Sequence, residues 1–531
     1  MREPWRNPTV RGLLLVCFLA ILAIAIQWLP QMFTNSPDQW EPPLQELPAS
    51  PPPVQLKPGD TTVTADFSTH LPLVVFDIGT EEPKLDNVWD SQKGYHVEVD
   101  YDPYEKGELW IIDNPDQINR LTDEGTIASN MQITQRGNSS RNYPKKQYAI
   151  ELLDESGHPI KRNLLGMGAE SDWILNVSWQ DPSLLRNYLA CTFGKVTSVP
   201  TLDGRYCEVV RRRGDSYEYL GVYLLLETVK RDPARVDIPK YRANQSKSFL
   251  LRRDRYNETQ YILNTYATLN GLTKEYLGVK YPKKEVLHPN DAKWIEDRIS
   301  SFEQALFSED IDTFLTYRNY IEVNSFVDYF LFNELMMNYD AGIHSTYLST
   351  SYTGRLKMGP YWDFDQGLAN DPEYVSKLDS TAFHDAPWFR QLLRDPNFVR
   401  ELEKRYHELR DGPLSDENLS LVIEHTQQYL GSAAQRDWNR WQYELITPKK
   451  DHVVVPQTYD EAVVSLCETL FTHAHWLDEH IDSLYQFSDL SIPQPKPEEV
   501  AKENADYYSQ LLSVAFIGVF FISALLIRRE L

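Results

Sequence analysis

Apolar positions alternate along the N-terminal half of the chain and follow a helical spacing in the C-terminal half. Alternation at 131–133 and 146–152 and the apolar run 73–77 predict strands from residue 61 to about residue 151. Asp181-Pro182 predicts the start of the first helix, because aspartate caps a helix and proline fits its first turn. Strands are expected again at 206–210 and 219–227, and helices dominate 292–337 and 395–486, with breaks near Gly412-Pro413 and Pro448. The sequence predicts an α+β fold.

Two longer apolar segments lie at the ends of the chain. Residues 12–29 are interrupted only by Gln27, and residues 511–527 contain no charged side chain. Each segment has about the minimum length that crosses a bilayer. Arginines precede the first segment and follow the second, which predicts that both termini are cytoplasmic. A cleaved signal peptide is the alternative for the first segment, but bulky residues follow it where a cleavage site needs small ones.

These segments predict a cell membrane protein with two transmembrane helices and an extracytoplasmic catalytic domain. Residues 34–60 are polar and rich in proline, which indicates an extended linker. The predicted order is a tail (1–11), a signal anchor (12–33), a linker (34–60), an ectodomain (61–490), a second linker (491–510), a transmembrane helix (511–527) and a tail (528–531).

Two groups of acidic residues flank a predicted hairpin. Asp340 precedes the strand-like run 346–349, and Asp363 and Asp365 follow the run 356–358 after a turn at Thr353-Gly354. Magnesium chemistry on phosphates needs one carboxylate beside the nucleophile and another that holds the metal. The alternative is that these aspartates only cap turns, which is common beside Gly or Asn.

A second polar segment lies between two predicted strands. Residues 135–141 form a loop of small and polar residues, in which backbone N–H groups can approach phosphates while Arg136 and Arg141 add positive charge. Lys146 shares a strand face with Tyr148 and Ile150, so its ammonium is expected to point toward whatever that face covers.

These motifs and several others follow one another in a set order along the chain. They are residues 136–146, 164–167, 171–175, 181, 186–187, 221–227, 338–340 and 362–365. In this order they resemble the CotH family, the spore-coat protein H kinases, strongly over residues 75–370 and less clearly to about residue 480. Members of that family are atypical protein kinases with a diverged two-lobed kinase fold, and they transfer phosphate from ATP to Ser or Thr of other proteins.

The resemblance implies a role for each matching residue. Lys146 corresponds to the lysine on the nucleotide phosphates, Asp340 to the catalytic-loop aspartate and Asp363 to the metal-holding aspartate. A typical kinase has a metal-binding Asn five residues after the catalytic aspartate, where this chain has Ser345, a weaker magnesium ligand. Glu227 is expected either to pair with Lys146 or to lie near the adenine. The implied nucleotide site is Arg136, Gly137, Asn138, Ser139, Ser140, Arg141, Lys146 and Glu227, and the implied site for Mg²⁺ or Mn²⁺ is Asp363, Asp365 and Ser345.

The net charge of the chain indicates which binding partners it would attract. The net charge is −24, and the two tails carry +2 and +1, so the remainder carries −24 − 3 = −27. Such an acidic domain disfavours nucleic acid and favours basic polypeptides.

The four cysteines form neither a disulfide framework nor a zinc pattern. A bridge between Cys191 and Cys207 is the alternative to free thiols.

The sequence therefore predicts a membrane-anchored protein Ser/Thr kinase that uses ATP with Mg²⁺ or Mn²⁺ on basic, Ser-rich surface or coat-type proteins. The alternative is a weak or inactive nucleotide-binding assembly module of the cell surface, because Ser345 replaces the expected amide. A third hypothesis is a glycoside hydrolase with two carboxylates, which the 12% aromatic content permits but no motif supports.

Overall fold

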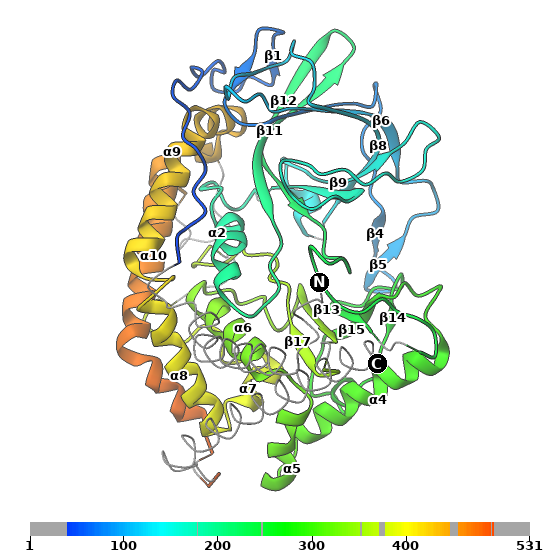
Figure 1. Ribbon diagram of the computed structural model, residues 1–531, viewed down its shortest axis with the longest axis vertical. Coiled ribbons are helices and arrows are strands. Elements are labelled where there is room, and N and C mark those ends of the chain that lie inside the picture. The colour runs from blue at the N-terminus through cyan, green and yellow to red at the C-terminus, as the bar shows by residue number, and fades with distance from the viewer. Residues whose placement is uncertain are drawn as a thin grey trace, which may run out of the picture.

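The computed structural model describes residues 40–492, except 138, 178, 246–247, 351–352, 371–376, 446–454 and 490. Both predicted transmembrane segments, both tails and most of the second linker lie outside these residues, as does the predicted break near Pro448. A closed sheet occupies one part of the described chain, a second sheet with helices around it occupies another, and long helices run along one side (Figure 1).

Seven strands form a sheet that closes on itself. Six of its seven pairings are antiparallel, and the seventh, between β3 and β11, is parallel. β11 also pairs with β12, which completes the ring, and the short β1 (Thr62–Val63) adds to β12. In ring order the strands are β12 (Ser216–Glu227), β10 (Asp172–Asn176), β9 (Gln147–Leu153), β8 (Ile127–Arg136), β6 (Glu105–Ile112), β3 (Leu73–Asp77) and β11 (Gly204–Arg213).

Alternate side chains of these strands fill the interior of the ring. Met131 and Ile133 of β8 pack there with Tyr148 and Ile150 of β9 and Trp173 of β10. Because successive strand residues point to opposite faces, the intervening residues of the same strands lie on the outer face. The period-two pattern of the sequence therefore marks the inside and the outside of the closed sheet.

The second sheet has the strand order β14-β15-β13-β16-β17. Leu348 pairs with Met358 and Thr350 pairs with Leu356, so the hairpin predicted between the acidic groups is confirmed. Its strands are β13 (Leu250–Asp254), β14 (Tyr261–Ile262), β15 (Tyr276–Tyr281), β16 (Thr346–Thr350) and β17 (Leu356–Met358). Two short pairs stand apart, namely β2 (Ser68–Thr69) with β7 (Asn119–Arg120) and β4 (Asn87–Asp90) with β5 (Tyr95–Glu98).

Helices account for most of the chain after residue 289, as predicted, with the break near Gly412-Pro413 between α8 and α9. The first predicted helix starts later than expected, because Asp181 and Ser183 form a turn and α2 begins at Arg186. The α-helices are α2 (Arg186–Phe193), α3 (Tyr266–Leu269), α4 (Pro289–Leu306), α5 (Ile311–Leu315), α6 (Val323–Leu335), α7 (Pro387–Leu392), α8 (Pro396–Arg410), α9 (Asp416–Trp441) and α10 (Tyr459–His480). The 3-10 helices are η3 (Ser139–Asn142), η4 (Gly194–Val196), η5 (Thr316–Asn319), η6 (Tyr443–Leu445) and η7 (Ile481–Phe487).

The architecture corrects two predictions. The two-lobed kinase-like fold flanked by transmembrane helices is wrong, because the N-terminal strands close into a seven-stranded ring. The predicted localisation, a membrane protein with two spans and an extracytoplasmic domain, is not supported either. Across the described part of the chain, none of the helices has both the length and the apolar character needed to span a membrane.

Buried ion pairs join α9 to the closed sheet. Arg436 of α9 contacts Glu208 of β11 at 2.7 Å, and Lys145, just before β9, contacts Asp437 at 2.6 Å. Asp437 also accepts from the backbone N–H of Val222 at 2.8 Å. Gly221 makes this approach possible, because its φ is +105° and a Cβ there would lie 2.2 Å from the carboxylate.

We expect Lys145→Met to lower the free energy of unfolding by about 3–5 kcal/mol, because it leaves the Asp437 carboxylate buried without its cation. Lys293→Met is the matched control, since that side chain is 65% exposed beside Asp297 and should change stability far less. Chemical denaturation of both variants measures the difference. Equal losses would show that the buried pair does not hold α9 to the sheet.

Candidate functional site

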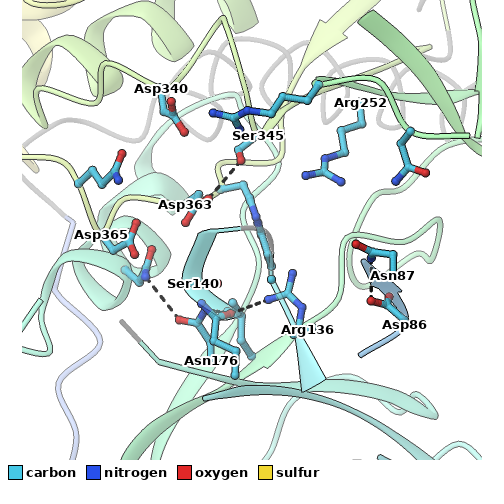
Figure 2. Close-up of a pocket in the computed structure, with 18 of the residues that line it drawn as sticks. Asp86, Asn87, Arg136, Ser140, Asn176, Arg252, Asp340, Ser345, Asp363 and Asp365 are labelled. Carbon is cyan, nitrogen blue, oxygen red and sulfur yellow. Dashed lines mark hydrogen bonds between the residues drawn. The ribbon is translucent and has the colours of Figure 1, made fainter. Parts of the chain in front are cut away.

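A polar cavity of about 350 Å³ lies between the two sheets (Figure 2). The closed sheet contributes residues from β8, β9, β10 and β12, and the second sheet contributes β13. Further lining residues come from α2, from β4, from the segment after β13 and from the loops after α6 and β17. The charged lining residues are Asp86, Arg136, Arg252, Arg255, Asp340, Asp363 and Asp365, and the polar lining residues include Ser140, Gln147, Asn176, Gln180, Asn187, Asn257, Thr259, Gln260, Ser345 and Gln366.

Three of the predicted aspartates gather along the loops that flank the hairpin. Figure 2 shows Asp340, Asp363 and Asp365 on the same part of the cavity, with Ser345 between the first two. Ser345 Oγ donates to Asp363 Oδ2 at 3.1 Å. Both residues adopt positive φ, +48° for Ser345 and +66° for Asp363. Non-glycine residues rarely adopt this conformation, and it is concentrated at binding and catalytic sites.

The first turn of α2 holds the Asp363 loop in place. Asn187 Oδ1 accepts from the Phe364 N–H at 2.9 Å, directly after Asp363. Arg186 Nε donates to the Gly367 carbonyl at 2.9 Å, and its Nη1 contacts Asp181 Oδ1 at 2.6 Å. Because Asp181 and Arg186 are buried, this ion pair fixes the loop rather than binding a ligand.

Three arginines form a positive part of the cavity opposite the aspartates. Arg136 Nη1 donates to Gln147 Oε1 at 2.8 Å, and its guanidinium lies 5.4 Å from the centre of the Trp362 ring. Arg252 belongs to β13, and Arg255 follows directly after that strand. Guanidinium groups bind phosphates well because they offer several donors in one plane.

The half-buried guanidiniums of Arg136 and Arg252 differ in their surroundings. Burial lowers the pKa of Arg136, and Tyr347 and Asp363 offset only part of that effect. Burial also acts on Arg252, but the nearby Tyr347, Asp254 and Asp363 outweigh it and raise its pKa. Arg136 therefore has the poorer compensation for its charge, and a bound anion would supply what is missing.

The structure does not bring every predicted residue to this cavity. Lys146 lies just before β9, and its Nζ donates to the Arg141 carbonyl at 2.6 Å outside the cavity lining. Arg141 itself binds the Asn87 side chain at 2.8 Å. Glu227 accepts from the Asp203 N–H at 2.9 Å and does not line the cavity.

The remaining nucleotide-site predictions fall on the loop after β8. Gly137 and Ser140 line the cavity, and Ser139 begins η3. Asn138 lies outside the described residues. The loop thus contributes to the lining at two of its predicted positions.

Several lining residues were not predicted from the sequence. Gln147, Asn176 and Asn187 are single amides in three different elements, and no spacing links them. Arg252 lies on β13, whose sequence LLRRD does not alternate between apolar and polar residues and so predicts no face. Among these residues, only Asn187 could have been singled out from the sequence, because it belongs to the 186–187 motif of the family resemblance.

The carboxylates of the cavity suit a divalent cation only when a bound ligand supplies further oxygen atoms. Within residues 40–492 as described, no group of three or more His, Cys, Asp or Glu side chains is arranged to hold a metal ion. Mg²⁺ is usually held by one or two carboxylates, with phosphate oxygens and water completing six positions. Asp363 and Asp365, facing three guanidiniums across one cavity, fit a metal that arrives with a phosphate-bearing ligand.

This arrangement of carboxylates and guanidiniums has the chemistry that a ligand with phosphates and a divalent cation would need. Residues 133–477 match the CotH family, described as CotH kinase protein, over more than half of the chain. The chain therefore belongs to the CotH family, and that membership indicates a kinase-like function. No curated protein matches the chain.

We expect Arg136→Met to weaken pyrophosphate binding by about tenfold or more, since a charge-assisted hydrogen bond contributes roughly 1.5–3 kcal/mol. Lys146→Met should weaken binding much less, because its ammonium is bound to the Arg141 carbonyl outside the lining. Titration calorimetry of both variants measures the dissociation constants. A larger loss in Lys146→Met would mean that the loop rearranges and that Lys146 is the phosphate ligand.

Proposed function

We propose that this CotH-family protein is a protein Ser/Thr kinase that transfers the γ-phosphate of ATP to a hydroxyl of another protein. The observation that carries the proposal is the cavity itself, in which Asp340, Asp363 and Asp365 face Arg136 and Arg252. Phosphoryl transfer needs positioning and charge neutralisation around the phosphate more than covalent chemistry by the protein.

Each side chain has a distinct task in this proposal. The acceptor hydroxyl oxygen attacks the γ-phosphorus, its proton passes to the Asp340 carboxylate, and the bond to the bridging oxygen breaks to release ADP. Asp363 and Asp365 would hold Mg²⁺ or Mn²⁺, which neutralises charge on the phosphate oxygens when bound. Arg136 and Arg252 orient the phosphate chain from the other side of the cavity.

The Ser345 hydroxyl supports the metal-holding residue. Because it donates to Asp363 Oδ2 at 3.1 Å, it leaves the other carboxylate oxygen available to a cation. We propose that Ser345 orients the Asp363 carboxylate, in addition to any direct contact with the metal.

The acceptor is proposed to be a basic, Ser-containing protein segment. Outside the two tails the chain carries −27, and opposite charge speeds encounter with basic polypeptides. Exposed charges are screened over about 8–10 Å at physiological salt, so this advantage should shrink as salt rises.

The test is phosphate transfer from labelled ATP by the purified full-length protein with Mg²⁺ or Mn²⁺. We expect Asp340→Asn to retain ATP binding and to lose transfer by about two to four orders of magnitude, the scale of positioned acid–base catalysis. Asp363→Asn should lose both transfer and its dependence on the divalent cation. Asp297→Asn is the matched control, because Asp297 lies on the exposed face of α4 away from the cavity.

Peptides with one fixed Ser and varied flanking charge test the acceptor at low and high salt. Equal transfer to acidic and basic peptides at low salt would contradict the charge preference alone. ATP binding by the unmodified protein with no transfer to any acceptor or to itself would contradict the kinase activity. That outcome would instead support a nucleotide-binding module without turnover.

A further inference from the structure

Four hydrogen bonds form one unbroken line between the acidic and the basic part of the cavity. The Phe364 N–H donates to Asn187 Oδ1 at 2.9 Å, and Asn187 Nδ2 donates to Asn176 Oδ1 at 3.4 Å. Asn176 Nδ2 donates to Gln147 Oε1 at 3.3 Å, and the same oxygen accepts from Arg136 Nη1 at 2.8 Å. Figure 2 labels Asn176 and Arg136 along this line.

The ends of the line fix the orientation of every amide in it. A backbone N–H only donates, so Asn187 presents its oxygen to Phe364 and its NH₂ group to Asn176. Asn176 must then accept from Asn187 and donate to Gln147. Arg136 also only donates, so Gln147 presents its oxygen to both neighbours. No single amide can turn over without breaking a bond at the next position.

The two central amides of the line lie at the site and are buried. Gln147 is 7% exposed and Asn176 is 8% exposed, and both line the cavity together with Asn187. Hydrogen bonds in such a low-dielectric environment are stronger than in water, and reversing one of them is costly. The Asp363 turn at one end has a positive φ that requires support from its surroundings.

We infer that Asn187 and Asn176 are positioning residues that couple the Asp363 turn to the Arg136 guanidinium through Gln147. The inference rests on the proposed function, in which Arg136 binds phosphate and Asp363 holds the metal. An amide reversed at the Asp363 end reverses each following amide and removes the acceptor of Arg136. The orientation of the Asp363 turn and the orientation of the Arg136 guanidinium therefore depend on each other.

Asn187→Asp is the decisive change because it alters hydrogen-bonding capacity and leaves shape nearly the same. The carboxylate still accepts from Phe364 but no longer donates to Asn176. Asn176 then turns its NH₂ group toward residue 187, Gln147 turns in response, and Arg136 faces an NH₂ group. The effect therefore reaches a guanidinium that residue 187 does not contact.

Asn257→Asp is the charge-matched control. Asn257 lines the same cavity and accepts from the Thr259 N–H at 2.9 Å, a role that a carboxylate keeps. It adds the same negative charge to the cavity but lies outside the line of amides. Any general repulsion of an anionic ligand appears in this variant as well.

The experiment is a double-mutant cycle on pyrophosphate affinity, measured by calorimetry without metal on the full-length protein. We expect Asn187→Asp to weaken binding about fivefold more in the wild-type background than in the Arg136→Met background. Asn257→Asp should weaken binding by the same factor in both backgrounds. If Asn187→Asp proves too unstable to purify, Asn176→Asp has the same expected outcome, because Asn176 also both accepts and donates.

If Asn187→Asp and Arg136→Met weaken pyrophosphate binding independently of each other, the coupling is overturned. The kinase proposal would then still be decided by the phosphate-transfer assay. Coupling without any phosphate transfer from ATP would support the line of amides and contradict the kinase. An unmodified protein that does not bind pyrophosphate would overturn the role of Arg136 and, with it, this inference.

Discussion

The Arg186–Asp181 ion pair is the constraint on which the cavity depends. A buried guanidinium must satisfy its donors, and Arg186 does so with Asp181 and with the carbonyls of Gly367 and Leu368. The loop that carries Asp363 is thereby held against α2, which packs on the closed sheet. This anchor acts together with the Phe364–Asn187 hydrogen bond to position the acidic residues after β17 relative to Arg136.

The second consequence of the fold is the separation of charge across the cavity. Asp340, Asp363 and Asp365 come from loops beside the second sheet. Arg252 belongs to β13 of that sheet, whereas Arg136 comes from the end of β8 in the closed sheet. Such a division suits a ligand that carries both phosphates and a divalent cation, because each side neutralises a different partner. The weakly compensated charge of Arg136 and the positive φ of Asp363 are both energetically unfavourable, and both belong to the preformed site.

The sequence predicts most strands of the closed sheet and the hairpin, because alternating apolar positions reflect burial on one face. It does not predict β13, β14 and β15 of the second sheet. Closure of the ring could not be predicted, since it depends on the parallel pairing of β3 with β11, which are far apart in the chain. The same limit applies to Lys146, which bonds to the Arg141 carbonyl and does not line the cavity. Asp340, Asp363 and Arg136 were found through motifs, whereas Gln147 and Asn176 meet only after folding.

The most direct test of the account is the position of a bound metal and nucleotide. Crystals grown with Mn²⁺ and a non-hydrolysable ATP analogue allow the metal to be located by its anomalous scattering. We expect the Mn²⁺ peak beside the Asp363 carboxylate, with the phosphates reaching Arg136 and Arg252 and the terminal phosphate near Asp340. A metal and nucleotide bound elsewhere in the protein, with this cavity holding only water, would contradict the account.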